Sequence, residues 1–263
     1  MPRLQLLGMP SPTMAGLGHV RFGQKPLVLL ARLLVEPRAV SREAMMAFLW
    51  PEASEARARG SLRQALHVVR EITGPGCLTA DRQSISLLNP LVTDLLEFLS
   101  AIRHGDWRQA ALTYGGPLLD GVALKDATDA EQWLVLERRR LSRLFETAAT
   151  ALLEAREPGS DGMTRLVIAR RLRDVAPRSV RSWRFLLEAL AEPHASDDLC
   201  FERAALGARI DTGQIDDPQA AAVLLEGGPL TRTTDRAPRI NADDAGDDRA
   251  AALHGGEREI AWP

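Results

Sequence analysis

Hydrophobic and polar positions along the first ninety residues alternate between the period of strands and the period of helices. Residues 4–7 and 19–22 predict short strands on either side of a turn-rich stretch, SPTMAGLG. From Pro26 to about residue 35, apolar side chains recur at the spacing of one helix face. After a short extended piece at 39–40, Ser41 is a suitable N-cap for a second helix that ends near Leu49.

A third helix and a hairpin complete this part of the chain. The helix is predicted from about residue 55 to Ile72, where Gly74, Pro75 and Gly76 end it. The stretches CLTA and SISLL, joined through DRQ, predict two antiparallel strands. Three helices followed by a hairpin indicate an α+β winged helix-turn-helix domain over residues 1–90.

From Asp94 the pattern changes to successive helices, which predicts an all-α domain over residues 91–225. Thr128 and Glu131 form the pattern of a capping box ahead of a long helix to about residue 154. The remaining helices are expected at 94–103, 107–114, 164–175, 179–191 and 198–209. Paired helices with short turns suggest a tetratricopeptide-like helical-repeat array, of which GDWRQAALTY and WRFLLEALA are fragments. Residues 226–263 have little periodicity and are expected to be a disordered tail.

The third helix has two different sides. On a helical wheel its apolar residues fall within about 60° of Leu62 and predict a buried stripe. These residues are Ala58, Leu62, Ala65, Leu66 and Val69. The opposite side carries hydrogen-bonding groups and one glycine, with further arginines nearer the rim. Because the preceding helix ends at a tight turn, this is the arrangement of a helix-turn-helix unit.

The outer side of this helix suits a DNA major groove. Gln64 can pair bidentately with adenine, Arg57 and Arg63 can pair with guanine, and Gly60 removes bulk where the helix approaches the bases. His67 lies on the same side. Three more arginines are candidates for phosphate contacts, which position a protein without reading sequence. They are Arg42, Arg59 and Arg70. From this helix alone, an ordinary surface helix with solvated arginines is the alternative.

The hairpin that follows favours the DNA-binding interpretation, because a strand, turn and strand after a recognition helix make a wing. Arg82 stands in the turn and is expected to reach a neighbouring minor groove, where the potential is most negative. A simple solvent-facing turn is the alternative.

Charge supports an anionic partner for the first domain only. Residues 1–90 carry 11 Lys and Arg against 6 Asp and Glu, although the whole chain has a formal charge of −2. Only two of the basic residues are lysines, a bias that phosphate recognition or a GC-rich genome would each explain. No apolar run approaches the length of a membrane span or a secretory signal, so we expect a cytoplasmic protein without a membrane partner.

No catalytic or cofactor pattern stands out, and we expect neither enzymatic activity nor a bound cofactor or metal. GHVRFGQK departs from a phosphate-binding loop, since its lysine comes one residue late and no Ser or Thr follows. The five histidines show no paired ligand spacing, and Cys77 and Cys200 lie far apart without a CxxC pattern.

Several stretches resemble one family of regulators. They are LQLLG, VSREAMMAFLWPEASEARARGSLRQALHVVREI, DLLEFLSAIRHGDWRQAALTYGGPLLDG and DAEQWLVLERRRLSRL. The first ninety residues resemble the winged-helix effector domain of response regulators. The span to about residue 215 is similar to bacterial transcriptional activator domain proteins, typified by the Streptomyces antibiotic regulatory protein family. The resemblance implies an N-terminal β-sheet on a winged unit that binds promoter repeats, and a helical domain that supports activation. By this resemblance, the residues expected to contact DNA are Arg57, Arg63, Gln64 and His67, which lie in the matching helix.

The sequence therefore predicts a sequence-specific, DNA-binding transcriptional regulator, expected to be an activator. Double-stranded DNA is the expected partner, and RNA polymerase is a candidate partner of the helical domain. Because one winged unit offers only a small contact area, we expect a homodimer on direct repeats. The competing hypothesis is a helical-repeat scaffold that binds a protein or peptide and has a winged domain without DNA-binding activity.

Overall fold

The first part of the chain folds as three helices and a small sheet, as its pattern predicts. The computed structural model describes residues 4–10, 23–36, 38–74, 76–88, 91–155, 162–191 and 196–227. Helix α1 (Gln24–Val35) is followed by strand β1 (Val40–Ser41), helix α2 (Arg42–Leu49) and helix α3 (Glu55–Thr73). Ser41 caps α2, because its hydroxyl accepts a hydrogen bond of 3.0 Å from the Ala44 backbone N–H.

The hairpin consists of β2 (Leu78–Ala80) and β3 (Ser84–Leu87). With β1 these strands form an antiparallel sheet in the order β1-β3-β2. Val40 pairs with Ile85 on one side of β3, and Leu78 pairs with Leu87 on the other. Strand β1 therefore ties the hairpin to the start of α2.

The second part of the described chain is helical. Its elements are α4 (Asp94–His104), α5 (Trp107–Thr113), α6 (Thr128–Ala155), α7 (Gly162–Val175), α8 (Val180–Leu190), α9 (Ser196–Asp211) and α10 (Pro218–Leu225). Each helix packs chiefly on the one before it and the one after it. A winged-helix unit followed by a helical domain is thus the observed fold class, while its likeness to tetratricopeptide repeats stays a prediction.

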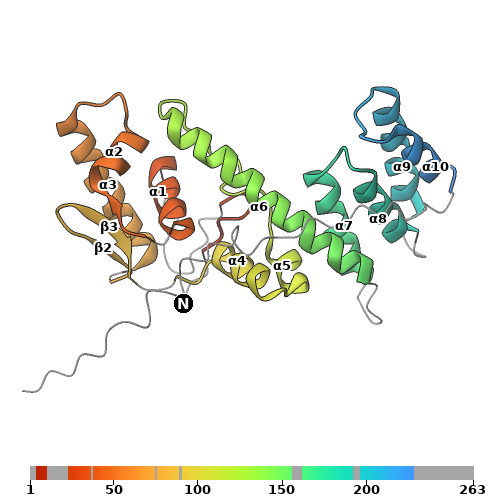
Figure 1. Cartoon of the computed structure of the whole chain (residues 1–263), viewed down its shortest axis with the longest axis horizontal. Helices are drawn as coiled ribbons and strands as arrows, with labels where there is room; N and C mark the ends of the chain where they lie inside the picture. The colour runs from red at the N-terminus through yellow and green to blue at the C-terminus, as the bar shows by residue number, and fades with distance from the viewer. Residues whose placement is uncertain are drawn as a thin grey trace, which may run out of the picture.

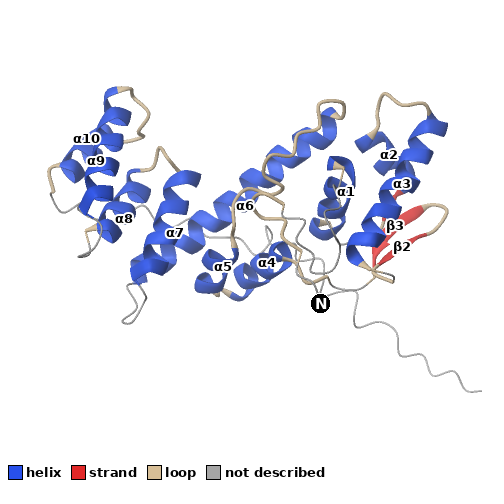
Figure 2. Ribbon diagram, turned by 180° about the vertical axis from the view of Figure 1, so that it is seen from behind, coloured by secondary structure: helices blue, strands red, loops and turns tan. Residues whose placement is uncertain are grey.

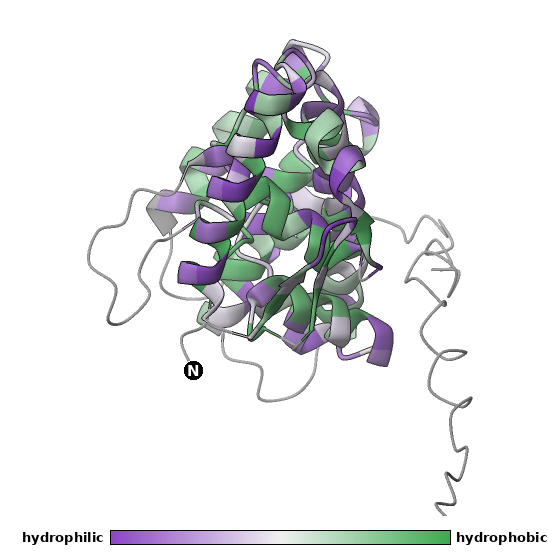
Figure 3. Cartoon of the chain, turned by 90° about the vertical axis from the view of Figure 1, so that its left-hand side faces the viewer, coloured by the Kyte–Doolittle hydropathy of each residue, from purple (hydrophilic) through white to green (hydrophobic). Residues whose placement is uncertain are grey.

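The molecule is elongated, with the winged unit at one end and α9 and α10 at the other (Figure 1). Helix α6 runs between the two ends, and the view from behind shows the same arrangement (Figure 2). Seen from the winged end, hydrophobic positions gather in the interior and hydrophilic ones along the outer ribbons (Figure 3). One continuous cluster of buried apolar side chains includes members from both parts of the chain. Among the described residues no helix is long and apolar enough to span a membrane.

Helix α10 was missing from the sequence prediction. Asp217 caps it by accepting a 2.9 Å hydrogen bond from the Ala220 backbone N–H, and Pro218 occupies its first position. The pattern Asp-Pro before an apolar run is a start signal for a helix. The stretch PQAAAVLL has no charged residue, so the amphipathic period that indicates a helix is weak there.

The predicted capping box is wrong. Thr128 is the first residue of α6 rather than the residue before it. The Glu131 carboxylate accepts a 2.7 Å hydrogen bond from the backbone N–H of Leu124, not from that of Thr128. A capping box makes local bonds within one turn, whereas here the carboxylate is used to hold the loop that precedes the helix.

The N-terminal segment does not form the short strand expected at residues 4–7. Leu4 makes a single parallel bridge with Thr93, and Leu7 makes a single antiparallel bridge with Leu118. The Gly8 N–H donates to the Pro117 carbonyl at 2.9 Å. Residues 4–8 therefore pair with the segments on either side of α4 and α5. The second expected strand, 19–22, and most of the expected tail lie outside the described residues.

A buried carboxylate fixes this segment. Asp94 is 5% exposed, and its two oxygens accept hydrogen bonds from the backbone N–H groups of Leu6 (2.8 Å) and Leu7 (2.9 Å). The same carboxylate accepts a bond of 2.8 Å from the Leu95 N–H. Since an unpaired buried carboxylate would be costly, the Asp94 side chain and the N-terminal segment depend on each other. The domain boundary at residue 90 stays a prediction.

Gly115→Ala tests this packing. A Cβ at Gly115 would lie 2.5 Å from the Leu7 carbonyl oxygen, so the N-terminal segment would have to shift. We expect the free energy of unfolding to fall by about 1–3 kcal/mol, the usual range for overpacking. Urea unfolding followed by circular dichroism measures this value. An unchanged midpoint would show that the segment does not lie against the glycine.

Candidate nucleic-acid interface

Helix α3 buries one side on the rest of the winged unit. The predicted stripe is confirmed, and Ile72 extends it. Leu62 and Val69 are completely buried. The helix packs mainly on α1, with further contacts to α2 and β2. Burial of about 1.5–3 kcal/mol for each large apolar side chain fixes the rotation of the helix about its own axis, and thereby decides which residues point outward.

The opposite side of α3 is exposed. The residues of α3 that are predicted to face DNA are all exposed, and none of the helices α4 to α10 is a main neighbour of α3. They are Arg57, Arg59, Gly60, Arg63, Gln64, His67 and Arg70. Figures 1 and 2 show α3 at the outer end of the molecule. A groove-sized partner therefore meets no obstacle from the described part of the helical domain.

Two of these side chains have a carboxylate partner on the same helix. Arg59 pairs with Glu55 one turn earlier. His67 Nε2 lies 3.4 Å from a carboxylate oxygen of Glu71. Exposed pairs of this kind contribute at most about 1 kcal/mol, so a phosphate can replace the carboxylate as the partner of Arg59.

Gly60 lies in open space. A Cβ at this position would have no other atom of the described chain within 4 Å, apart from the neighbouring turns of its own helix. The folded chain therefore does not require a glycine here. Because glycine in a helix costs up to about 1 kcal/mol relative to alanine, close approach of an external partner is a reason for its presence.

The turn of the hairpin is held by one carboxylate. Asp81 Oδ1 accepts hydrogen bonds from the backbone N–H groups of Gln83 (2.7 Å) and Ser84 (2.6 Å), and Oδ2 accepts from the Ser84 hydroxyl at 2.9 Å. The Ser84 and Gln83 bonds keep the pKa of Asp81 below its ordinary value. Arg82 stands in this turn with an exposed side chain. Sequence reasoning selected Arg82 and missed Asp81, although Asp is a common first residue of such turns.

The Arg42 side chain is less exposed than we expected for a residue that contacts a DNA phosphate. Its side chain is half-buried, and Nη1 donates a 3.3 Å hydrogen bond to the Asp81 carbonyl. Its backbone N–H donates to the Gln83 carbonyl at 2.8 Å. Arg42 therefore contacts the wing, and a role in binding phosphate stays a prediction.

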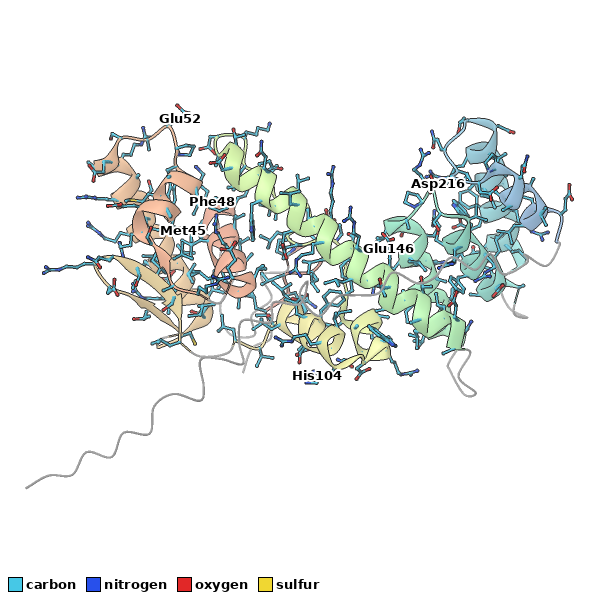
Figure 4. The ribbon with its side chains drawn as sticks, viewed as in Figure 1. Met45, Phe48, Glu52, His104, Glu146 and Asp216 are labelled. Atoms are coloured by element: carbon cyan, nitrogen blue, oxygen red, sulfur yellow. The ribbon has the colours of Figure 1, made fainter. Side chains whose placement is uncertain are left out.

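Helix α2 joins the winged unit to α6. The rings of Phe48 and Trp133 meet edge to face with centroids 6.0 Å apart, and the Arg32 guanidinium lies 4.0 Å from the Phe48 ring centroid. Figure 4 shows Phe48 between α2 and α6. A salt bridge of 2.7 Å joins Lys25 to Asp126, and the Lys25 ammonium lowers the pKa of the Asp126 carboxyl. These contacts set the orientation of the winged unit on the helical domain.

Several arginines of the helical domain have structural roles that the sequence did not indicate. Arg138 donates to three backbone carbonyls, those of Leu118 (2.8 Å), Leu119 (2.6 Å) and Val122 (2.8 Å). Arg171 donates to the Tyr114 carbonyl, and burial lowers the pKa of its guanidinium. The abundance of arginine is therefore not by itself a sign of nucleic-acid binding. Within the described ranges, no group of His, Cys, Asp and Glu side chains is arranged to hold a metal ion.

The Gly60→Ala variant tests whether the fold itself requires a glycine at this surface. Because the new methyl meets nothing in the folded chain, we expect the free energy of unfolding to rise by up to about 1 kcal/mol. Urea unfolding of the full chain measures it, with Gly115→Ala as the variant of opposite sign. A loss of stability in Gly60→Ala would mean that the outer side of α3 is packed against something.

One comparison with known proteins yields a likeness, and it concerns the fold. No model of a protein family matches the chain, and no curated protein matches it. The solved structure of Mycobacterium tuberculosis EmbR in complex with a low affinity phosphopeptide is similar, with a TM-score of 0.51 and 21% sequence identity. The match covers 88% of this chain and 66% of that one, slightly less than two thirds. The chain therefore shares the fold of the matched part of EmbR.

Proposed function

We propose that the chain is a DNA-binding transcriptional regulator of the Streptomyces antibiotic regulatory protein type, that it is not an enzyme, and that α3 is its recognition helix. The observation that carries the proposal is the outer side of α3, which presents arginines, a glutamine and a glycine to solvent beside an exposed wing. The resemblance in sequence to that family supports it, and so does the fold that the chain shares with the matched part of EmbR.

The exposed groups divide into two kinds of contact. The side chains of Arg57, Arg63 and Gln64 make no hydrogen bond or ion pair with other described residues and can be directed wholly to base edges. Arg59 and Arg70 lie nearer the edge of the surface, where the sugar-phosphate backbone borders the groove. Phosphate contacts dominate the affinity and make it fall with salt, whereas base contacts decide the sequence.

The helical domain is proposed to support activation through contact with RNA polymerase or a sibling subunit. Contacts between α2 and α6 join it to the winged unit, so we expect its position to follow from the position of α3 on DNA. This part of the proposal rests on the resemblance in sequence and on the shared fold.

The direct experiment is genome-wide selection of DNA fragments by the purified full chain, followed by binding measurements on the enriched sequence. Enrichment of a repeated motif supports the proposal. Absence of binding to any duplex at low salt excludes it and favours the helical scaffold. The scaffold hypothesis has one observation in its favour, since Met163 on α7 and Phe201 on α9 are 65% and 72% exposed.

Substitutions on α3 should affect DNA binding in two different ways, depending on whether the residue contacts a base or a phosphate. Gln64→Ala is expected to relax specificity at one base-pair position, where a good bidentate contact discriminates by about 1–3 kcal/mol. Arg59→Ala is expected to weaken binding to all sequences and to reduce the salt dependence by about one phosphate contact. Fluorescence anisotropy on the selected site, its point variants and random DNA measures both effects.

The matched control is Arg108→Ala, because Arg108 is an exposed arginine on α5. It should leave both affinities unchanged. If Gln64→Ala weakened binding to selected and random DNA equally, its role in reading a base would be wrong. If Arg59→Ala weakened binding to the selected site alone, its role as a phosphate contact would be wrong.

Two protomers are expected on each regulated site. A single winged unit covers a small part of a duplex, and specific affinity is gained when a second unit binds a neighbouring repeat. Titration of a two-repeat duplex, monitored by native mass spectrometry, should give two chains per duplex. A single chain bound to one half-site at saturation would contradict the expectation.

A further inference from the structure

We propose that Asp81 and Arg42 are positioning residues that hold the turn of the wing against α2, so that Arg82 reaches the DNA minor groove beside α3. The inference rests on the proposed function. It assigns no DNA contact to Asp81 and gives Arg42 a role through the wing rather than through phosphate.

The Asp81 side chain fixes the shape of the turn. The Asp81 carboxylate accepts three hydrogen bonds within the turn, from two backbone N–H groups and one hydroxyl, at 2.6–2.9 Å. The Asp81 backbone N–H donates to the Ser84 carbonyl at 3.1 Å and closes the turn from the other side. Arg82 lies inside this closed loop. Its backbone direction is therefore set by the bonds that Asp81 makes.

Arg42 attaches the turn to the rest of the winged unit. Arg42 reaches the turn with its guanidinium, at the Asp81 carbonyl, and with its backbone N–H, at the Gln83 carbonyl. Its neighbour Ser41 pairs with Ser84 in the sheet and also caps α2. Because α2 packs on α3, a chain of direct contacts leads from the wing to the recognition helix.

The charge of Asp81 opposes DNA binding. A carboxylate near a duplex repels phosphate, so an acidic residue beside the wing arginine lowers affinity unless it serves the structure. Asp81 is exposed and ionised at neutral pH, because the ordinary pKa of an Asp carboxyl lies well below 7 and the bonds in the turn lower it further. Two roles for Asp81 therefore predict opposite results. If Asp81 acted only by charge, its removal would tighten DNA binding. If it positions the wing, its removal weakens binding.

The experiment uses the full chain and the DNA site selected by it. Affinities are measured by fluorescence anisotropy for Asp81→Ala, Asp81→Asn, Arg82→Ala and Arg42→Ala, and for the double variants that combine Asp81→Ala or Arg42→Ala with Arg82→Ala. Gln83→Ala is the matched control, since the Gln83 side chain is exposed in the same turn and its bonds come from the backbone.

We expect Asp81→Ala, Arg42→Ala and Arg82→Ala each to weaken binding about five- to tenfold, a loss of about 1–1.4 kcal/mol. The affinity of each double variant for the site should lie within about twofold of the affinity of Arg82→Ala, because a misplaced wing has no contact left to lose. Asp81→Asn should retain binding, since an amide oxygen can accept the same backbone bonds.

Amide hydrogen exchange gives a readout that does not depend on DNA. The N–H groups of Gln83 and Ser84 should exchange faster in Asp81→Ala than in the parent chain or in Asp81→Asn. Unaltered exchange would overturn the proposal. So would tighter binding by Asp81→Ala, loss of binding by Asp81→Asn, or additive losses in the double variants. If the parent chain binds no duplex at all, the proposed function itself fails, and that result is distinct from all of these.

Discussion

The arrangement depends on one constraint, which is that α3 must bury a single stripe and leave its opposite side bare. Leu62, Leu66 and Val69 lie in the core, so the helix cannot rotate without bringing arginine into an apolar interior. The cost of burying an unpaired charge is far larger than the cost of leaving it in water. The basic side therefore stays on the surface for the same reason that the apolar side stays inside.

A second constraint comes from the way the N-terminal segment is bound. Residues 4–8 are bound to the backbone at 92–94 and 117–120, and the Asp94 carboxylate is buried among their N–H groups. Glycines 115 and 116 let the two backbones approach closely, with the Leu7 carbonyl where a side chain at 115 would stand. Together with the Phe48–Trp133 contact, these bonds make the winged unit and the helical domain share one apolar core. Packed side chains, rather than a free linker, therefore join the winged unit to the helical domain.

Arginine stands in two kinds of environment in this chain. The exposed arginines of α3 face solvent, with Arg59 paired to Glu55 of the same helix, whereas Arg138 satisfies backbone carbonyls in a loop and Arg171 does the same at Tyr114. The guanidinium group suits both environments because it carries several donors in a fixed plane and keeps its charge when partly buried. Composition alone does not distinguish these uses, since both raise the count of arginine.

The sequence by itself determined the order of the elements and the two sides of α3, because hydrophobic period, N-caps and glycines act over a few residues. Ser41, Gly74 and the alternation in the hairpin each mark a local boundary that tertiary packing left in place. Only the tertiary structure decided the partner of the N-terminal segment, the bond from Glu131 to Leu124 and the contact of Arg42 with the wing. The bridges and the Arg42 contact join residues separated by many positions, and no periodic pattern records which distant segment will meet them. The bond from Glu131 spans only seven residues, but it runs to a loop that the helical period does not describe. Helix α10 combines both cases. Its start signal is local, but the uniformly apolar stretch PQAAAVLL does not show which side of the helix is buried, and only the helices that pack on it decide that.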